Sequence, residues 1–275
     1  MTTPDNALTI GVIINGDEIL SGKREDRHFH KAREILAARG LCLSWASYLG
    51  DDRRRCTEAL RQSFQSNDLV FSFGGIGATP DDHTRQAAAE ALGRPLGLHP
   101  QAADLIAQRT AEAGQPLTPE RLRMGEFPQG ASIVPNPYNK IPGFSVDRHY
   151  FLPGFPVMAW PMMEWVLDTH YSSHFCLAAE VDRSMIVFQL YEAAVTQLLE
   201  ELNADYPELR VYSLPSAPNP QDPNSRRHLE LGLKQPAASA SIADAAQRFD
   251  RAYGRLRSGV LSLGGEIGDE RCASR

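Results

Sequence analysis

The sequence predicts an α/β fold: a three-layer α/β/α domain with a mostly parallel sheet, followed by a small α+β module. Two observations predict it. Apolar runs of strand length alternate with helical patterns up to about residue 170, which is typical of a parallel sheet with helices on both faces. Beyond about residue 171 the pattern restarts as strand, helix, strand, strand and helix.

The first three strands are short apolar runs, each followed by a polar or glycine-rich turn. These strands are expected at residues 8–14, 41–49 and 69–73, and the helices that follow them at residues 28–39, 53–65 and 83–92. The first helix has apolar side chains at helical spacing and ends at Gly40. The second begins after Asp51 and Asp52, two acids at the positive end of the helix dipole.

The remaining elements complete the first domain and form the second module. In the first domain we expect two helical pieces within residues 100–125, strands near 132–134, 143–146 and 149–152, and a helix over 156–170. In the second module we expect strands at 185–190, 209–213 and 228–234, and helices at 192–203 and 242–257. We therefore predict a first domain over residues 1–175, a βαββα module over 176–260 and a loosely ordered tail over 261–275.

Composition excludes several classes of protein. The chain has 275 residues, of which 42% are hydrophobic and 23% are charged, as in an ordinary globular protein. The net charge of −6 argues against a nucleic-acid surface, which needs clustered Lys and Arg. The four cysteines form no CxxC pair, and neither a signal peptide nor an apolar run long enough to span a bilayer is present. We expect a reduced, cytoplasmic protein without a membrane or nucleic-acid partner.

The strongest local signal is the glycine-rich segment 74–85, directly after the third strand. Its glycines allow a tight turn and a close backbone approach to a ligand, and its polar side chains open a helix whose free N–H groups favour an anion. The candidate phosphate-binding residues are Gly74, Gly75, Gly77, Thr79 and Thr84, and the candidate acids are Asp81 and Asp82. A plain turn with a helix cap is the alternative. A divalent cation that bridges carboxylate and phosphate is a further possibility.

Other polar turns also follow strand ends and could line the same crevice. The turn at residues 15–18 contributes the acids Asp17 and Glu18, and the hydroxyl of Ser21 suits a phosphate. Lys140 and Gly154 lie in two further loops of this kind. Each of these turns could equally be an ordinary connection between a strand and a helix. The pairs His28 with His30 and His170 with His174 are weaker candidates for a metal site, because no HExxH context is present.

Four motifs in order match a known family. They are GDEILSG at residues 16–22, GDD at 50–52, GGIGATPDDHTR at 74–85 and LPGFP at 152–156. Together they resemble the molybdopterin-binding, MoaB/Mog-like domain, in the version found in the N-terminal part of competence/damage-inducible protein A (CinA). The match covers about residues 7–170, and residues 181–258 resemble the small KH-like module that follows this domain. The chain stops before the deamidase domain of that protein, so this activity is expected to be missing.

The resemblance implies a function and a set of roles. Relatives of the CinA type are associated with metal-dependent hydrolysis of the pyrophosphate in ADP-ribose, whereas Mog-like relatives transfer adenylate to molybdopterin. Carried over, the glycines and Thr79 would hold phosphate, and the acids would hold a divalent metal (Mg or Co) or orient the attacking water. The metal candidates are Asp81, Asp17 and Glu18, and the catalytic candidates are Asp81, Asp82 and Asp17.

Three functions stay open at this point. The chain is expected to be a pyrophosphatase of the ADP-ribose type, a molybdopterin adenylyltransferase, or a non-catalytic module that binds a nucleotide or a pterin. Its partner is expected to be a small phosphate-containing ligand, and a homo-oligomer is expected from the family, with a dimer favoured. The sequence departs from the usual pattern at residues 21–24, which are more basic, and at Ala78, which is commonly proline.

Overall fold

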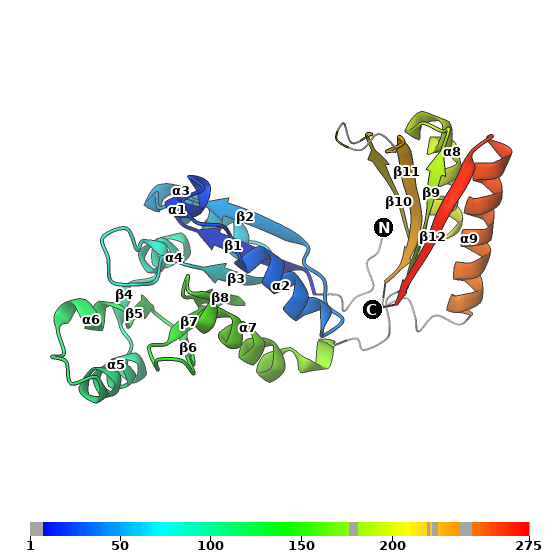
Figure 1. Ribbon diagram of the computed structural model, residues 1–275. Coiled ribbons are helices and arrows are strands. Elements are labelled where there is room, and N and C mark those ends of the chain that lie inside the picture. Colours follow the sequence, from blue (N-terminus) through cyan, green and yellow to red (C-terminus); the bar gives the residue numbers. More distant parts are fainter. Residues whose placement is uncertain (1–7, 176–180, 219–220, 222–224, 237–243, 275) are drawn as a thin grey trace. The chain divides into compact units, whose positions relative to one another are not determined.

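A computed structural model describes residues 8–175, 181–218, 221, 225–236 and 244–274 (Figure 1). The chain divides into two compact units, Met1–Phe175 and Cys176–Arg275, and each is described here by itself. The predicted boundary at residue 175 falls at the same place. None of the described helices is both long and apolar enough to cross a membrane.

The first unit contains eight of the described strands and seven of the described α-helices. The strands are β1 (Ile10–Asn15), β2 (Trp45–Leu49), β3 (Leu69–Phe73), β4 (Leu96–Leu98), β5 (Glu126–Pro128), β6 (Ser132–Val134), β7 (Gly143–Val146) and β8 (His149–Leu152). The helices are α1 (Asp17–Leu20), α2 (His28–Ala37), α3 (Arg53–Phe64), α4 (Thr84–Leu92), α5 (Pro100–Glu112), α6 (Pro119–Arg123) and α7 (Pro156–His170), followed by a 3-10 turn, η1 (Ser172–His174). The short strands β4 and β5 pair with each other and were not predicted.

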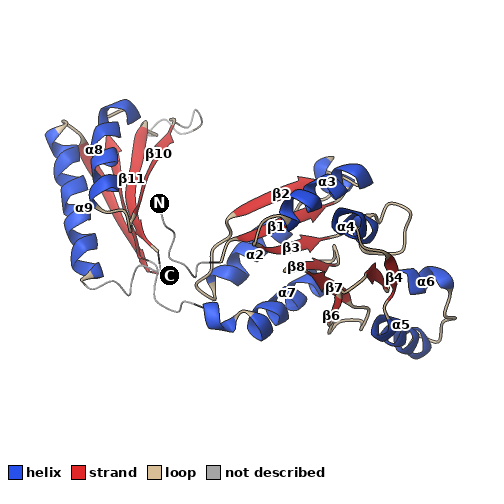
Figure 2. Cartoon of the chain, turned by 180° about the vertical axis from the view of Figure 1, so that it is seen from behind, coloured by secondary structure: helices blue, strands red, loops and turns tan. Residues whose placement is uncertain are grey.

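The main sheet of the first unit has six strands in the order β2-β1-β3-β8-β7-β6 (Figure 2). The first four are parallel, and β7 and β6 add an antiparallel edge. One apolar core joins this sheet to α2 and α7, and a second core joins the opposite face to α3, α4 and α5. The predicted fold class, a three-layer α/β/α domain with a mostly parallel sheet, is confirmed.

The register of the parallel strands aligns their carboxyl ends. Asn15 pairs with Leu49, the last residues of β1 and β2. Phe73, which ends β3, pairs with Ile14 on one side and Leu152 on the other. The turns that follow these four strands therefore leave the same edge of the sheet, which is where parallel sheets bind ligands.

The second unit is a four-stranded antiparallel sheet with two helices packed on one face. Its elements are β9 (Val181–Phe188), α8 (Glu192–Asp205), β10 (Arg210–Ser216), β11 (His228–Gln235), α9 (Ala245–Ser262) and β12 (Glu266–Ser274), with strand order β10-β11-β9-β12. The core lies between the sheet and the helices, where Leu231 on β11 and Leu256 on α9 are fully buried.

The structure corrects the prediction for the C-terminus. Residues 261–275 were expected to form a loosely ordered tail, but Glu266–Ser274 form β12, which pairs with β9 along its whole length. Ile267 on this strand packs against the core, whereas most of the other side chains are polar and exposed because β12 is an edge strand. Its pairing shifts register between Ile267 and Glu270. A polar strand with a register shift has little apolar alternation, which is the signal that sequence analysis depends on.

Candidate functional site

The turns at the carboxyl edge of the parallel sheet enclose a cavity of about 430 Å³. The glycine loop, Gly74–Thr79, forms one wall together with Asp81 and Asp82. Residues from the other turns complete it, and the lining also includes Asn15, Gly16, Glu18, Ile19, Arg24, His28, Asp51, Met124, Asn136, Asn139, Ile141, Pro142, Pro153, Gly154, Phe155 and Met158. Glycines and acids therefore share one cavity with an apolar wall.

The glycine loop has a backbone that only glycine adopts without strain. Gly74 has φ 92° and donates its N–H to the carbonyl of Leu152 at 2.9 Å. Gly75 has φ 71°, and a Cβ at this position would lie 2.1 Å from Thr84 Oγ1. The Thr84 hydroxyl donates to the Gly74 carbonyl at 3.1 Å and is buried. Thr84, which was predicted to bind ligand, thus fixes the loop from behind and does not line the cavity.

The two acids after the loop have different environments. Asp82 Oδ2 accepts hydrogen bonds from the backbone N–H of Thr79 at 2.8 Å and from the Thr79 hydroxyl at 2.5 Å. Asp81 is exposed at the cavity rim. Interaction with the Thr79 side chain and with its own backbone N–H lowers the pKa of Asp81 below its ordinary value. Asp82 therefore holds the turn closed, while Asp81 presents an ionised carboxylate to the cavity.

A buried arginine supports the loop from the side away from the cavity. Arg85 is 2% exposed and donates to the Gly77 carbonyl at 2.6 Å and to the Arg123 carbonyl. Burial lowers its pKa, yet an arginine stays charged at neutral pH. The motif that contains Arg85 does not by itself indicate this role. Its fixed positive charge behind the glycine loop favours an anion in front of it.

A pair of acids spans the next two strand ends. The backbone N–H of Asp17 donates to Asp51 Oδ2 at 3.0 Å, and the backbone N–H of Asp51 donates to Asp17 Oδ1 at 3.2 Å. Burial raises the pKa of Asp51, and the nearby charges of Asp17, Glu18 and Asp81 raise it further. Three carboxylates from two other turns therefore act on Asp51 at the rim of the cavity.

His28 connects three parts of the cavity wall. It is buried, its ring stacks on Phe73 with 4.6 Å between the ring centroids, and its Nε2–H donates to the Gly154 carbonyl at 3.0 Å. Burial lowers the pKa of His28, so the ring is neutral and its buried Nδ1 has no partner among the described residues. The metal pair with His30 does not form, because His30 is exposed and contacts Glu34.

The structure brings together eight of the predicted site residues and leaves four outside the cavity lining. Those that line the cavity are Glu18, Gly74, Gly75, Gly77, Thr79, Asp81, Asp82 and Gly154. Asp17 lies behind Asp51, and the Ser21 hydroxyl donates to the Glu18 carbonyl at 3.4 Å. Lys140 forms an ion pair with Glu112 and does not face the cavity. Arg24 is the only Lys or Arg among the described lining residues.

The acids at the rim fit a divalent cation in chemistry but form no complete ligand set. Carboxylate oxygens are the ligands that Mg²⁺ prefers. Among the described residues, however, no three His, Cys, Asp or Glu side chains converge closely enough to hold a metal ion. A cation at this rim would therefore take several ligands from water and from the phosphates of a bound molecule, as Mg²⁺ commonly does.

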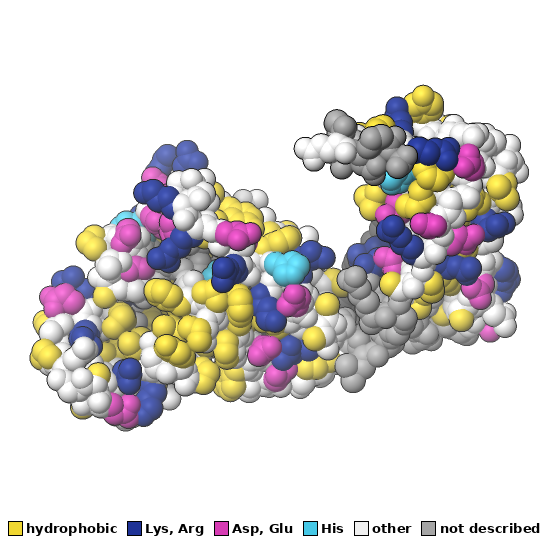
Figure 3. Space-filling model, viewed as in Figure 1, with side chains coloured by type: hydrophobic (Ala, Val, Ile, Leu, Met, Phe, Trp, Pro, Cys, Tyr) yellow, Lys and Arg dark blue, Asp and Glu magenta, His cyan; other side chains and the backbone are white. Residues whose placement is uncertain are grey.

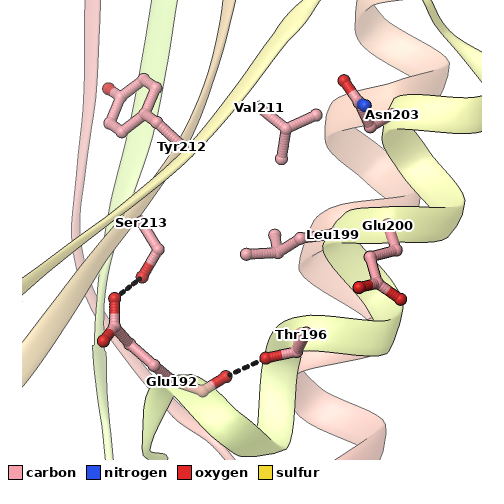
Figure 4. Close-up of a pocket in the computed structure, with 8 residues that line it drawn as sticks. All are labelled: Glu192, Thr196, Leu199, Glu200, Asn203, Val211, Tyr212 and Ser213. Carbon is pink, nitrogen blue, oxygen red and sulfur yellow. Dashed lines mark hydrogen bonds between the residues drawn. The ribbon is translucent and has the colours of Figure 1, made fainter.

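The second unit has a groove of different character (Figure 4). It lies between α8 and the edge strand β10, and its volume is about 510 Å³. Its lining contains Glu192 and Glu200 but no glycine, Lys or Arg. Glu192 Oε1 accepts a hydrogen bond from the Ser213 hydroxyl at 3.2 Å. A groove lined by acidic side chains, without Lys or Arg among its described lining residues, disfavours the phosphate ligand that the first cavity favours.

Fold and site together define the class of the first unit: a three-layer α/β domain with a ligand cavity across the carboxyl edge of a parallel sheet. Comparison with known proteins then gives the family. A family model described as a probable molybdopterin binding domain matches residues 11–171, and the chain belongs to this family. The resemblance predicted from the four motifs is confirmed.

Several relatives share this domain. A CinA-like protein of Anaeromyxobacter dehalogenans (strain 2CP-C) is 33% identical over 165 residues, which cover 58% of this chain and 40% of that protein. The chain thus spans about 40% of the length of the CinA-like relatives that it matches first. A protein of Pyrobaculum calidifontis is 27% identical over 242 residues, 86% of this chain and 92% of its own. The solved structure of CinA from Thermoplasma acidophilum, described as of unknown function, has 27% identity and a TM-score of 0.53, with coverage of 58% of this chain and 97% of that one.

Proposed function

We propose that the first unit is a divalent-metal-dependent hydrolase of a nucleotide diphosphate linkage, of the kind found in ADP-ribose. The observation that carries the proposal is the meeting of the glycine loop and the carboxylates of Glu18, Asp51 and Asp81 in one cavity. Phosphate binding needs N–H donors and positive potential, whereas metal binding needs carboxylates. A substrate that carries both phosphate groups and a bound cation is complementary to the glycine loop and to the carboxylates of this cavity.

The phosphate end of the substrate is assigned to the glycine loop. Its open backbone, with Arg85 behind it, provides positive potential toward that side of the cavity, and Arg24 adds a positive charge to the lining. The apolar side chains of Ile141, Pro142 and Met158 line the same cavity and suit the flat ring of a nucleotide. The lining therefore matches a molecule with a ring at one end and phosphates at the other.

The reaction end is assigned to the rim acids. A bound divalent cation would polarise a phosphoryl oxygen and activate water, so that no protein nucleophile is needed. Asp81 and Glu18 face the cavity from opposite turns and would share the cation with the phosphates. Asp17 holds the Asp51 backbone and carboxylate in place through their two reciprocal hydrogen bonds. Asp82 shapes the turn.

Two alternatives have support of their own. The family match favours a role with molybdopterin, either adenylyl transfer in cofactor biosynthesis or plain binding of a pterin. Molybdopterin is also a flat ring that carries a phosphate, so it suits the same lining. Turnover separates the enzymes from the binding module, and the substrate separates the two enzymes. A cytoplasmic homodimer is part of the proposal. The mass of the purified protein in solution tests the dimer, and cell fractionation tests the location.

The test is a hydrolysis panel on the purified protein. ADP-ribose, NAD, FAD and ATP are each tried with Mg²⁺, Mn²⁺ and Co²⁺. Asp81→Asn is purified identically, and Asp104→Asn, an exposed carboxylate on α5 outside the cavity lining, is the matched control. We expect AMP release from ADP-ribose, a decrease of at least about 100-fold in Asp81→Asn, and normal rates in Asp104→Asn.

Each outcome decides between the candidates. Equal rates in all three proteins would indicate a contaminating enzyme and contradict the hydrolase. No turnover on any substrate, together with thermal stabilisation by a pterin or a nucleotide, would favour the binding module. Adenylate transfer to molybdopterin without hydrolysis of ADP-ribose would favour the cofactor-biosynthesis role.

A further inference from the structure

The turn between β6 and β7 is held by side-chain amides. Asn136 is 5% exposed, and its Oδ1 accepts the N–H of Tyr138 at 3.0 Å. Its Nδ2 donates to Asn139 Oδ1 at 2.8 Å and to the Ile141 carbonyl at 2.9 Å. The backbone of Lys140, with φ 64°, closes the turn by donating to the Asn136 carbonyl at 3.0 Å. The side-chain amide of Asn136 thus makes its hydrogen bonds within the turn.

This network fixes the orientation of the second amide, that of Asn139. Its Oδ1 accepts two hydrogen bonds, from Asn136 Nδ2 at 2.8 Å and from the Ile141 N–H at 3.0 Å. Both partners are donors, so the oxygen cannot exchange places with the nitrogen. The Nδ2 group must therefore point away from the turn.

The Asn139 nitrogen is left with a weak partner. The described residues offer it one acceptor, the thioether sulfur of Met158, at 3.6 Å. A thioether is a poor hydrogen-bond acceptor, and an amide nitrogen carries two N–H groups. Asn139 and Met158 both line the cavity, next to the apolar side chains of Ile141 and Pro142. The Asn139 Nδ2 group is therefore a hydrogen-bond donor in an apolar wall, with only a weak acceptor among the described residues.

We propose that Asn139 recognises the edge of a ligand ring by donating a hydrogen bond to a ring nitrogen or a ring carbonyl oxygen. The inference rests on the proposed function only for the class of ligand, a flat heterocycle that carries phosphates. Because both lone pairs of Asn139 Oδ1 are occupied, the residue can donate to the ring but cannot accept from it. Asn139 is therefore a specificity residue that selects rings with an acceptor on the edge facing it.

The experiment compares a ligand that has a ring with one that has none. The probes are ADP-ribose and inorganic pyrophosphate, and the dissociation constant of each is measured calorimetrically without a divalent cation, so that no hydrolysis accompanies binding. Asn139→Asp keeps an oxygen for the Asn136 and Ile141 donors and replaces only the group that faces the cavity. We expect the ADP-ribose constant to rise about 10- to 100-fold relative to that of pyrophosphate, corresponding to one lost hydrogen bond inside the cavity.

Two further variants separate hydrogen bonding from charge. Lys140→Gln changes the net charge by the same amount on the next residue, outside the cavity lining, and should shift both probes alike. Asn139→Leu removes the donor without adding charge and should again weaken ADP-ribose selectively. Selective loss in both Asn139 variants supports the inference.

Three results would overturn it. The first is an unchanged ratio of the two constants in the Asn139 variants, and the second is equal affinity of the unmodified protein for both probes. The third is no binding of either probe. Because this experiment measures binding alone, ADP-ribose that binds here but is not hydrolysed in the metal panel contradicts the proposed hydrolase and leaves the role of Asn139 intact.

Discussion

The two units are each one sheet with helices packed on it, yet their strand directions give them different surfaces. In the first unit β2, β1, β3 and β8 are parallel, so four strand ends and their turns meet at one edge. In the second unit the strands are antiparallel, and neighbouring ends lie at opposite edges. Parallel strands collect separate motifs of the sequence into one cavity, and antiparallel strands disperse them.

The polar groups of the two units differ in the same way. The first unit buries Asn15, His28 and Arg85 near its cavity, each held by hydrogen bonds to the backbone of another turn or strand. The second unit places its charges outside, and on the face seen in Figure 3 its basic and acidic side chains lie interspersed. Arg248 with Glu208 and Arg257 with Glu270 are pairs of this kind. In the first unit buried polar groups such as these line or support the cavity, whereas the buried polar residues of the second unit, Ser184 and Gln235, lie in its sheet.

The largest expected effect tests whether the two units are stable independently. Phe249 on α9 is 3% exposed in the second core, and Phe249→Ala should lower the free energy of unfolding by about 3–5 kcal/mol. All three tryptophans, Trp45, Trp160 and Trp165, lie in the first unit, so their fluorescence reports that unit alone. In urea, circular dichroism should show an earlier transition while the tryptophan transition stays in place. A tryptophan transition that shifts equally would show that the units unfold together.

A smaller effect, in the first unit alone, is expected from the glycine loop. Gly75→Ala forces φ 71° on a residue with a Cβ and displaces the Thr84 hydroxyl, which should cost about 2–4 kcal/mol and abolish pyrophosphate binding. Gly93 is the matched control, because its φ is 62° and no atom lies within 4 Å of an added Cβ. Gly93→Ala should cost about 1–2 kcal/mol and leave binding normal. Normal binding in Gly75→Ala would contradict the assignment of the phosphate site.

The response to acid should also separate the units. Burial lowers the pKa of His28 and His149 below the ordinary 6.5, so the unfolded chain binds more protons below that pH and the first unit loses stability there. Asp26 faces His28, and Asp68 and Asp147 face His149; these acids reduce the shift without reversing it.

In the second unit the sign is the same but the pH window is lower. Hydrogen bonds from Arg248 and Arg257 lower the pKa of Glu208 and Glu270, so their contribution is present above pH 4.5 and lost below it. Urea unfolding is measured at a series of pH values. The urea midpoint of the tryptophan transition should fall from about pH 6.5 downward, at a higher pH than the midpoint of the circular dichroism transition of the second unit. A simultaneous loss that begins only below pH 4.5 would contradict the neutral, buried histidines.

The smallest effect is expected from a surface ion pair. Arg257 Nε lies 3.1 Å from Glu270 Oε1, on the exposed side of α9 and β12. Arg257→Gln should change the free energy of unfolding by less than about 1 kcal/mol, because water screens an exposed pair. The difference between variant and parent should vanish in high salt. A change as large as that of Phe249→Ala would mean that this pair is a buried part of the fold.

Most of the first unit could be predicted from its sequence because its strands are short, apolar and punctuated by turns. The alternation of strand and helix predicted the parallel sheet, and the turns at strand ends predicted where the cavity lies. Local patterns do not contain the contacts made across the sheet. Asp51 was expected at a helix start and within the GDD motif but was given no role at the site, yet the pairing of Asn15 with Leu49 brings it beside Asp17 and the cavity.

Long-range contacts also explain which predicted roles changed. Thr84 and Lys140 have side chains that can bind phosphate. However, the Thr84 hydroxyl donates to the Gly74 carbonyl, and Lys140 forms an ion pair with Glu112. His28 and Asn139 line the cavity and contact Gly154 and Asn136. The sequence marked His28 only as a weak metal candidate with His30 and gave Asn139 no role. Chemistry can be read from residue type, whereas the direction in which a side chain points depends on partners distant in the sequence.

The boundary after residue 175 has a consequence for how such a protein can change over evolutionary time. Every residue that lines the cavity lies between Ile14 and Met158, inside one compact unit. A recombination event that exchanged the gene segment after codon 175 would leave each of these side chains with its neighbours. The residues that line the cavity would therefore be inherited together, and the first unit could be joined to different second units.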